Sequence, residues 1–128
     1  MPPPETSSIG DIGQIAIAVH DVARAKSFYA GVLGLKPLFD AEPNLSFLAA
    51  GSVRIMLTLP EGAGKAVGNS ILYFRTAAID ATYSAIIERG ADPGPAPRMV
   101  ARMDDHELWM GFVRDPDGNL VGLMEERR

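Results

Sequence analysis

The chain has 128 residues, a hydrophobic fraction of 47% and a net charge of −4, which suits one compact domain or two small half-domains that share a core. The acidic balance, without a lysine or arginine cluster, argues against a nucleic-acid partner. The absence of cysteine excludes disulfides and thiolate metal sites. No apolar run approaches the roughly 18 residues of a membrane span, and the N-terminus does not resemble a signal peptide. We therefore expect no membrane partner and a cytoplasmic location.

The first half of the chain predicts one strand, one helix and three further strands. Residues 12–19 alternate in the manner of a strand. Asp21 is a suitable helix N-cap, because its carboxylate can accept the free amides of a first turn. The helix that follows, at 22–33, carries an apolar stripe and ends before Gly34. The three further strands are predicted at 36–40, 45–50 and 53–59.

The same order of elements is predicted again in the second half. A strand at 70–75 precedes a helix at 79–89 that ends before Gly90. Residues 91–97 are too rich in proline for regular structure, and strands follow at 98–102, 107–114 and 120–124. This repetition divides the chain into a flexible tail at 1–11, a first module at 12–60, a connector at 61–69 and a second module at 70–128.

The last two predicted strands are joined by Asp115-Pro116-Asp117-Gly118. Proline presets φ at the second turn position, aspartate bonds local backbone, and glycine tolerates a positive φ. Apolar residues flank the segment on both sides, so it predicts a hairpin.

Two segments carry a resemblance to a known family. They are I-G-Q-I-A-I-A-V-H-D-V-A-R-A-K-S-F-Y-A-G-V-L-G-L, from Ile12, and F-V-R-D-P-D-G-N-L-V-G-L-M-E, from Phe112. They resemble the opening and closing modules of the vicinal oxygen chelate superfamily, which includes glyoxalase I, bleomycin-resistance proteins and extradiol dioxygenases. The resemblance implies an α+β fold in which two βαβββ modules form curled mixed sheets around a small-molecule cavity, with the helices outside. It also implies a homodimer.

Enzymes of this superfamily usually hold a divalent ion at four inward strand positions. The resemblance places these positions at Gln14, Met56, Ile71 and Gly122. Gln14 offers an oxygen and Met56 only a soft thioether, whereas Ile71 and Gly122 offer no side-chain donor. We therefore expect no metal at the usual place and no cofactor, and only non-standard ligands would allow one.

Alternation along the strands predicts which other side chains line the cavity. Arg54 could clamp a carboxylate or phosphate, or pair with Glu107. Trp109 is expected to face the cavity with Glu107, where it could stack on a planar ligand, although a core position is an equal alternative. The predicted outward side chains of that strand are Leu108, Met110 and Phe112. The candidate ligand-binding residues are Gln14, Arg54, Met56, Tyr73, Glu107, Trp109 and Met124.

Two classes of function follow. The first is a metal-free protein that binds an apolar or aromatic small molecule, with Arg54 admitting an anionic one. The alternative is a lyase, isomerase or dioxygenase of the same superfamily, metal-dependent through non-standard ligands. A metal-free catalyst with Glu107 or His106 as base is also open. The sequence favours binding and assigns no catalytic residue.

Overall fold

The computed structural model describes residues 10–41, 44–60 and 70–128. The predicted connector, 61–69, and all but the last two residues of the predicted tail lie outside these residues, so the division into modules stays a prediction. No helix in the described part of the chain is long and apolar enough to cross a membrane. The cytoplasmic location likewise stays a prediction.

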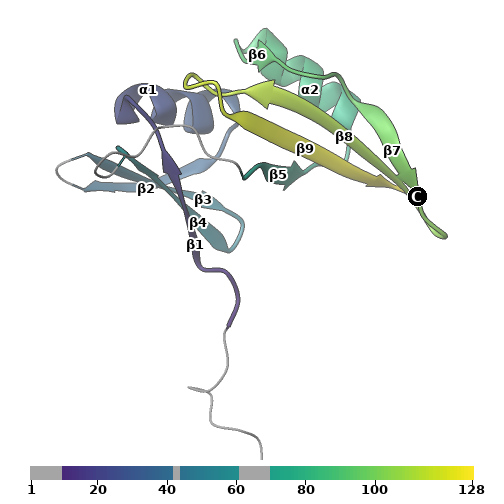
Figure 1. The fold of residues 1–128 in the computed structure, drawn as a ribbon, viewed down its shortest axis with the longest axis horizontal. Coiled ribbons are helices and arrows are strands. Elements are labelled where there is room, and N and C mark those ends of the chain that lie inside the picture. Colours follow the sequence, from purple (N-terminus) through teal and green to yellow (C-terminus); the bar gives the residue numbers. More distant parts are fainter. Residues whose placement is uncertain (1–9, 42–43, 61–69) are drawn as a thin grey trace, which may run out of the picture.

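Two mixed sheets form the framework (Figure 1). The first has the order β1-β4-β3-β2, with β1 parallel to β4 and the other neighbours antiparallel. Its strands are β1 (Gln14–Ala18), β2 (Lys36–Ala41), β3 (Leu45–Ala50) and β4 (Val53–Thr58). The second has β5 parallel to β9 and β9 antiparallel to β8, which also pairs with β6 and β7. Its strands are β5 (Leu72–Arg75), β6 (Asp92–Pro93), β7 (Arg98–Arg102), β8 (Glu107–Arg114) and β9 (Leu120–Arg127).

The proline-rich segment at 91–97 is more ordered than predicted. Its residues Asp92 and Pro93 pair with β8, and the Gly94 amide donates to the Phe112 carbonyl at 2.9 Å. Prolines at a sheet edge are tolerated because their missing N–H need not enter the ladder. The prediction of irregular structure was therefore wrong for Asp92 and Pro93, which form a short edge strand.

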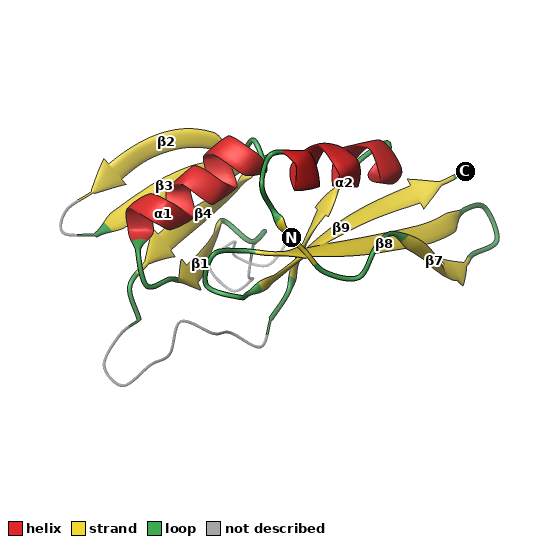
Figure 2. Cartoon of the chain, turned by 90° about the horizontal axis from the view of Figure 1, so that it is seen from above, coloured by secondary structure: helices red, strands yellow, loops and turns green. Residues whose placement is uncertain are grey.

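The helices lie on one side of the sheets, as the view from above shows (Figure 2). α1 (Val22–Lys26) continues as the π-helical segment η2 (Ser27–Val32), and α2 (Ile79–Glu88) belongs to the second half. A buried core that includes Phe28, Leu57, Ile86 and Val121 packs between helices and sheets. The sheets curl without closing. This arrangement confirms the predicted α+β fold class of two βαβββ units with the helices outside.

The two helices begin with different kinds of cap. The Arg24 amide donates to Asp21 at the start of α1, which confirms the predicted N-cap. α2 begins after Ala78, which provides no side-chain cap. Instead, the Ile79 amide donates to Glu125 of β9 at 2.8 Å. The cap of α2 therefore comes from a residue distant in sequence.

We expect the Glu125→Gln variant to be about 1 kcal/mol less stable than the wild type at pH 7, because a carboxylate stabilises a helix N-terminus. A hydrogen bond from Arg127, together with the Ile79 amide, lowers the pKa of Glu125. A lowered folded-state pKa gives stability that is present above the unfolded pKa, about 4.3, and is lost as the pH falls through the folded pKa. Urea unfolding from pH 7 to pH 3 should therefore show the difference shrinking. A difference that persists unchanged at pH 3, or an equal effect in Glu126→Gln, would contradict this role.

Candidate functional site

The face of each sheet opposite the helices is here called the open face. On the other face, Ile15, Ile55 and Leu57 pack into the core, so alternation assigns their neighbours to the open face. The strand registers extend this assignment across each sheet. On the first sheet the open face carries Gln14, Ala16, Phe39, Phe47, Arg54 and Met56. On the second sheet it carries Tyr73, Met110, Phe112, Gly122 and Met124.

Three predicted site residues contact one another on the first sheet. Arg54 Nε donates to Gln14 Oε1 at 2.6 Å, and Gln14 Nε2 lies 3.7 Å from the Met56 sulfur. The guanidinium of Arg54 lies over Phe47, 5.2 Å from the ring centroid. Strand alternation predicted that these three side chains share one face, but it did not identify Phe47. Pairing β3 with β4 would have placed Phe47 beside Met56 on that face.

On the second sheet, Tyr73 covers Gly122. The two residues are partners in the β5–β9 register, and a Cβ atom at position 122 would lie 2.5 Å from a ring carbon of Tyr73. The Tyr73 ring also meets Phe112 edge-on, with 5.7 Å between centroids. Met124 lies on the same face and pairs with Met110. This face is therefore aromatic and thioether-rich.

The predicted inward orientation of Glu107 and Trp109 in β8 was wrong, and Trp109 takes the alternative position, packed against the core. Val113 pairs with Val121, and both lie in the core, so Glu107 and Trp109 point to the helix side. There, Trp109 Nε1 donates to Glu107 at 3.0 Å, and Arg127 lies over the indole at 4.1 Å. The apolar run of Leu108, Met110 and Phe112 predicts the core face, whereas the structure places Met110 and Phe112 on the open face. The hairpin turn could have corrected this, because residues equidistant from it pair.

The expected pair between Arg54 and Glu107 does not form, since Glu107 contacts Arg102 at 3.0 Å on the helix side. His106 also lies away from solvent, with 15% of its side chain exposed. Its Nδ1 lies 2.7 Å from Asp105 and its Nε2 lies 3.6 Å from Glu126. His106 is therefore held between two carboxylates beside β9.

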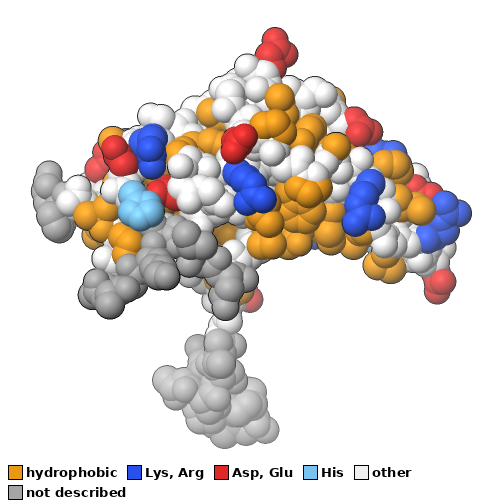
Figure 3. All heavy atoms as spheres, turned by 45° about the horizontal axis from the view of Figure 1, so that its top comes forward, with side chains coloured by type: hydrophobic (Ala, Val, Ile, Leu, Met, Phe, Trp, Pro, Cys, Tyr) orange, Lys and Arg blue, Asp and Glu red, His pale blue; other side chains and the backbone are white. Residues whose placement is uncertain are grey.

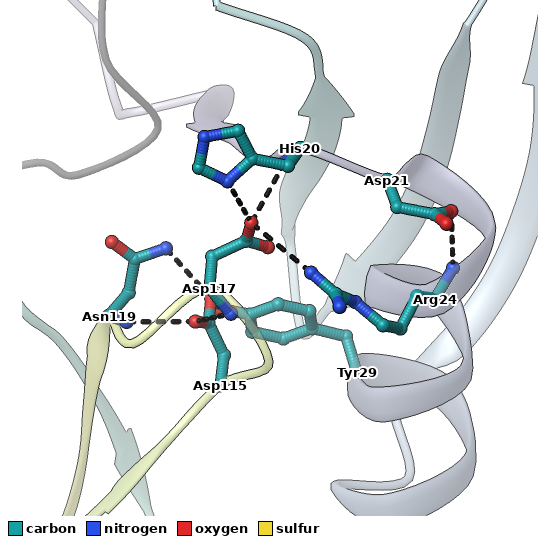
Figure 4. Close-up of polar contacts among 7 residues, drawn as sticks. All are labelled: His20, Asp21, Arg24, Tyr29, Asp115, Asp117 and Asn119. Carbon is teal, nitrogen blue, oxygen red and sulfur yellow. Dashed lines mark hydrogen bonds and ion pairs between the residues drawn. The ribbon is translucent and has the colours of Figure 1, made fainter.

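A polar cluster of His20, Tyr29, Asp115, Asp117 and Asn119, here called the hairpin clamp, ties the β8–β9 turn to η2 and to the residue before the Asp21 cap (Figure 4). The hydroxyl of Tyr29 donates to Asp115 at 2.8 Å, and burial, followed by the Asp115 charge, raises the pKa of Tyr29. Asp117 Oδ1 accepts from the backbone amide of His20 at 2.9 Å and lies 2.7 Å from His20 Nδ1. These contacts give the D-P-D-G turn a structural role beyond forming a hairpin.

Two cavities lie where β1 faces β5, at the seam between the sheets. They measure about 700 Å³ and 250 Å³ and are lined mainly by apolar side chains, including Ile15, Leu72 and Phe74. In the described residues β1 pairs only with β4 and β5 only with β9. The seam therefore presents unpaired backbone groups, which an apolar ligand cannot satisfy. The open face is the better candidate site, although the seam contains more enclosed volume.

Curled sheets with both helices on one side define the glyoxalase fold class. The chain belongs to the Glyoxalase/Bleomycin resistance protein/Dioxygenase superfamily, whose family model matches residues 11–123. This confirms the resemblance seen in the sequence. No curated protein sequence matches the chain.

Several solved structures are similar to most of the chain. A member from Sphaerobacter thermophilus is 27% identical, with a TM-score of 0.77 and coverage of 92% of this chain and 98% of that one. A glyoxalase-related enzyme from Fulvimarina pelagi is 17% identical, with a TM-score of 0.74 and coverage of 91% and 88%. TnmS3, an antibiotic-binding protein from Streptomyces, is 23% identical, with a TM-score of 0.72 and coverage of 93% and 98%.

The residues at the superfamily's metal positions do not fit a divalent ion. Gln14 Oε1 already accepts from Arg54, whose positive charge would repel a cation. Met56 is a soft ligand, Ile71 has no donor, and Gly122 lies beneath the Tyr73 ring. Among the described residues, no group of three or more histidine, aspartate or glutamate side chains is arranged to hold a metal.

Proposed function

We propose that the protein is a metal-free small-molecule-binding protein whose open face holds an apolar or aromatic ligand. The observation that carries this proposal is the replacement of the four metal positions by Gln14, Met56, Ile71 and Gly122, on a face rich in aromatic rings and thioethers. Phe39 is 51% exposed and Tyr73 is 41% exposed. Such surface suits recognition of an apolar or aromatic molecule.

The similarity to TnmS3 supports this proposal by analogy, because that protein is named as antibiotic-binding. The metal-dependent alternative lacks suitable donors at the superfamily's positions. Of the predicted ligand-binding residues, Gln14, Arg54, Met56, Tyr73 and Met124 remain candidates on the open face. For Glu107 and Trp109 a direct role is not proposed, since both lie on the helix side.

We also propose a homodimer. Among the described residues, one edge of β1 and one edge of β5 have no neighbouring strand, and such edges can add strands from another chain. Exposed apolar side chains, such as Ile12 and Leu38, give a second copy further surface to bury. Figure 3, which shows another side of the molecule, has apolar side chains at the surface between charged ones. A second copy would turn an open face into a more enclosed cavity.

Methionine methyl resonances of isotope-labelled, untagged protein test the binding site. Titration with 2-naphthalenemethanol, a neutral aromatic alcohol, is expected to shift the Met56, Met110 and Met124 methyls, which lie on the open face. Met99, which pairs with Trp109, should not shift. The diffusion coefficient measured on the same sample should correspond to a particle of twice the chain mass of 13.7 kDa, as expected for a dimer.

Paramagnetic Ni²⁺ supplies the second arm of this experiment. Because Gln14 is bonded to Arg54 and Met56 is a soft ligand, the metal positions do not fit a divalent ion, and Ni²⁺ should leave the Met56 methyl unbroadened. Broadening of Met56 at one equivalent of Ni²⁺ would support the metal-dependent alternative. If 2-naphthalenemethanol shifts only the Met99 and Met103 methyls, or shifts no methyl, binding on the open face is overturned. If the diffusion coefficient corresponds to the mass of a single chain, the dimer is overturned.

A further inference from the structure

Three planar groups lie side by side on the open face of the first sheet. The rings of Phe39 and Phe47 are stacked, with 4.5 Å between centroids and 24° between planes. The guanidinium of Arg54 lies 5.2 Å from the Phe47 centroid. Their strands, β2, β3 and β4, are consecutive neighbours. The arrangement is here called the Phe39–Phe47–Arg54 stack, and it combines apolar surface with one positive charge.

Gln14 fixes the orientation of the guanidinium in this stack. It accepts the Nε–H of Arg54 at 2.6 Å and is itself within 3.7 Å of the Met56 sulfur. The two terminal nitrogens of Arg54 make no hydrogen bond or ion pair with any residue in the described part of the chain. Gln14 is therefore a positioning residue that leaves the terminal edge of the guanidinium available.

Several other basic side chains of the chain are paired with a carboxylate. Arg102 contacts Glu107 at 3.0 Å, Arg128 contacts Asp105 at 2.8 Å, and Lys26 contacts Asp40 at 2.9 Å. Arg54 has no such partner among the described residues. Its planar fork matches a carboxylate through two parallel N–H bonds, a geometry that lysine cannot provide.

We propose that the Phe39–Phe47–Arg54 stack selects planar organic carboxylates. This rests on the proposed function, that the open face binds small molecules, and adds the chemical class of the ligand. The carboxylate binds the terminal nitrogens of Arg54, and the planar body of the ligand lies against Phe39, which is 51% exposed. Phe47 is only 8% exposed and supports the stack by packing against both Phe39 and Arg54. Selectivity comes from the charge, and the rings accept a range of aromatic bodies.

Two probes of closely similar shape test this proposal on the 128-residue chain: 2-naphthoate, which is anionic, and 2-naphthalenemethanol, which is neutral. Calorimetry is expected to show that naphthoate binds at least about tenfold more tightly, as a charge-assisted hydrogen bond of ~1.5 kcal/mol provides. Arg54→Met should remove this preference by weakening the binding of naphthoate about tenfold. Arg54→Lys should restore only part of the preference, because it keeps the charge without the fork.

Arg98→Met is the matched control, since it removes the same charge from the open face of the second sheet, where Arg98 pairs with Met110. It should leave the preference unchanged. If both probes bind the wild type equally, or if Arg98→Met removes the preference as Arg54→Met does, the carboxylate proposal is overturned while binding on the open face stands. If neither probe binds, the proposed function fails as well.

Discussion

Replacing Asp115 by alanine is expected to lower the free energy of unfolding by about 4 kcal/mol. Asp115 is 3% exposed and accepts hydrogen bonds from the Tyr29 hydroxyl, the Asp117 and Asn119 amides and the Asn119 side chain. The alanine variant leaves these donors without their acceptor inside a largely buried cluster, and an unsatisfied buried donor costs roughly 1–3 kcal/mol. Urea unfolding followed by circular dichroism measures the loss.

Tyr29→Phe is the matched control for Asp115→Ala. It removes one donor and leaves the turn amides bonded to Asp115, so we expect a loss of only about 1 kcal/mol. Should Asp115→Ala prove no more destabilising than Tyr29→Phe, the turn amides would not depend on the carboxylate, and the hairpin clamp would be a minor feature.

Gly122→Val is expected to cost about 3 kcal/mol, because a side chain at this position overpacks against Tyr73. The Cβ alone would approach the Tyr73 ring to 2.5 Å. The backbone at Gly122 has no positive φ, so the loss reports the contact between side chains and not a forbidden conformation. Chemical unfolding of the single variants and the double variant measures it.

The Tyr73→Ala/Gly122→Val double variant separates this contact from a general effect of valine. Removing the ring should recover most of the loss, giving a coupling energy of roughly 2 kcal/mol. Gly13→Val is a further control, since no atom outside its chain neighbours lies within 4 Å of a Cβ there, and it should be nearly neutral. Equal destabilisation by Gly122→Val with and without Tyr73 would show that the ring does not restrict this position.

Much of the fold could be predicted because its signals are local. The Asp21 cap precedes an apolar helical stripe, and Gly34 and Gly90 adopt positive φ values of 86° and 107° at helix ends, as their positions predict. The turn at Asp115 likewise depends on residues within four positions. By contrast, the cap of α2 is Glu125, which lies 46 positions from Ile79, and no local pattern reveals such a partner.

The site was only partly predictable, because strand alternation gives two equal faces and does not say which one meets the helices. In β4 the apolar residues identified the core face correctly, so Arg54 and Met56 were placed well. In β8 both faces are apolar, so the pattern did not show which face meets the helices, and the predicted inward orientation of Trp109 was wrong. The contact of Tyr73 with Gly122 depends on register between strands that the sequence places far apart.

The hairpin clamp also bears on how the chain folds. Tyr29 and Asp115 are 86 positions apart, and His20 and Asp117 are 97 apart, so these contacts raise the contact order and require closure of a very long loop. We expect the clamp to form after the folding barrier. Substitutions that strengthen the clamp should then slow unfolding and leave the folding rate nearly unchanged. The native state would live longer, and measurements of the refolding rate alone would not detect this gain.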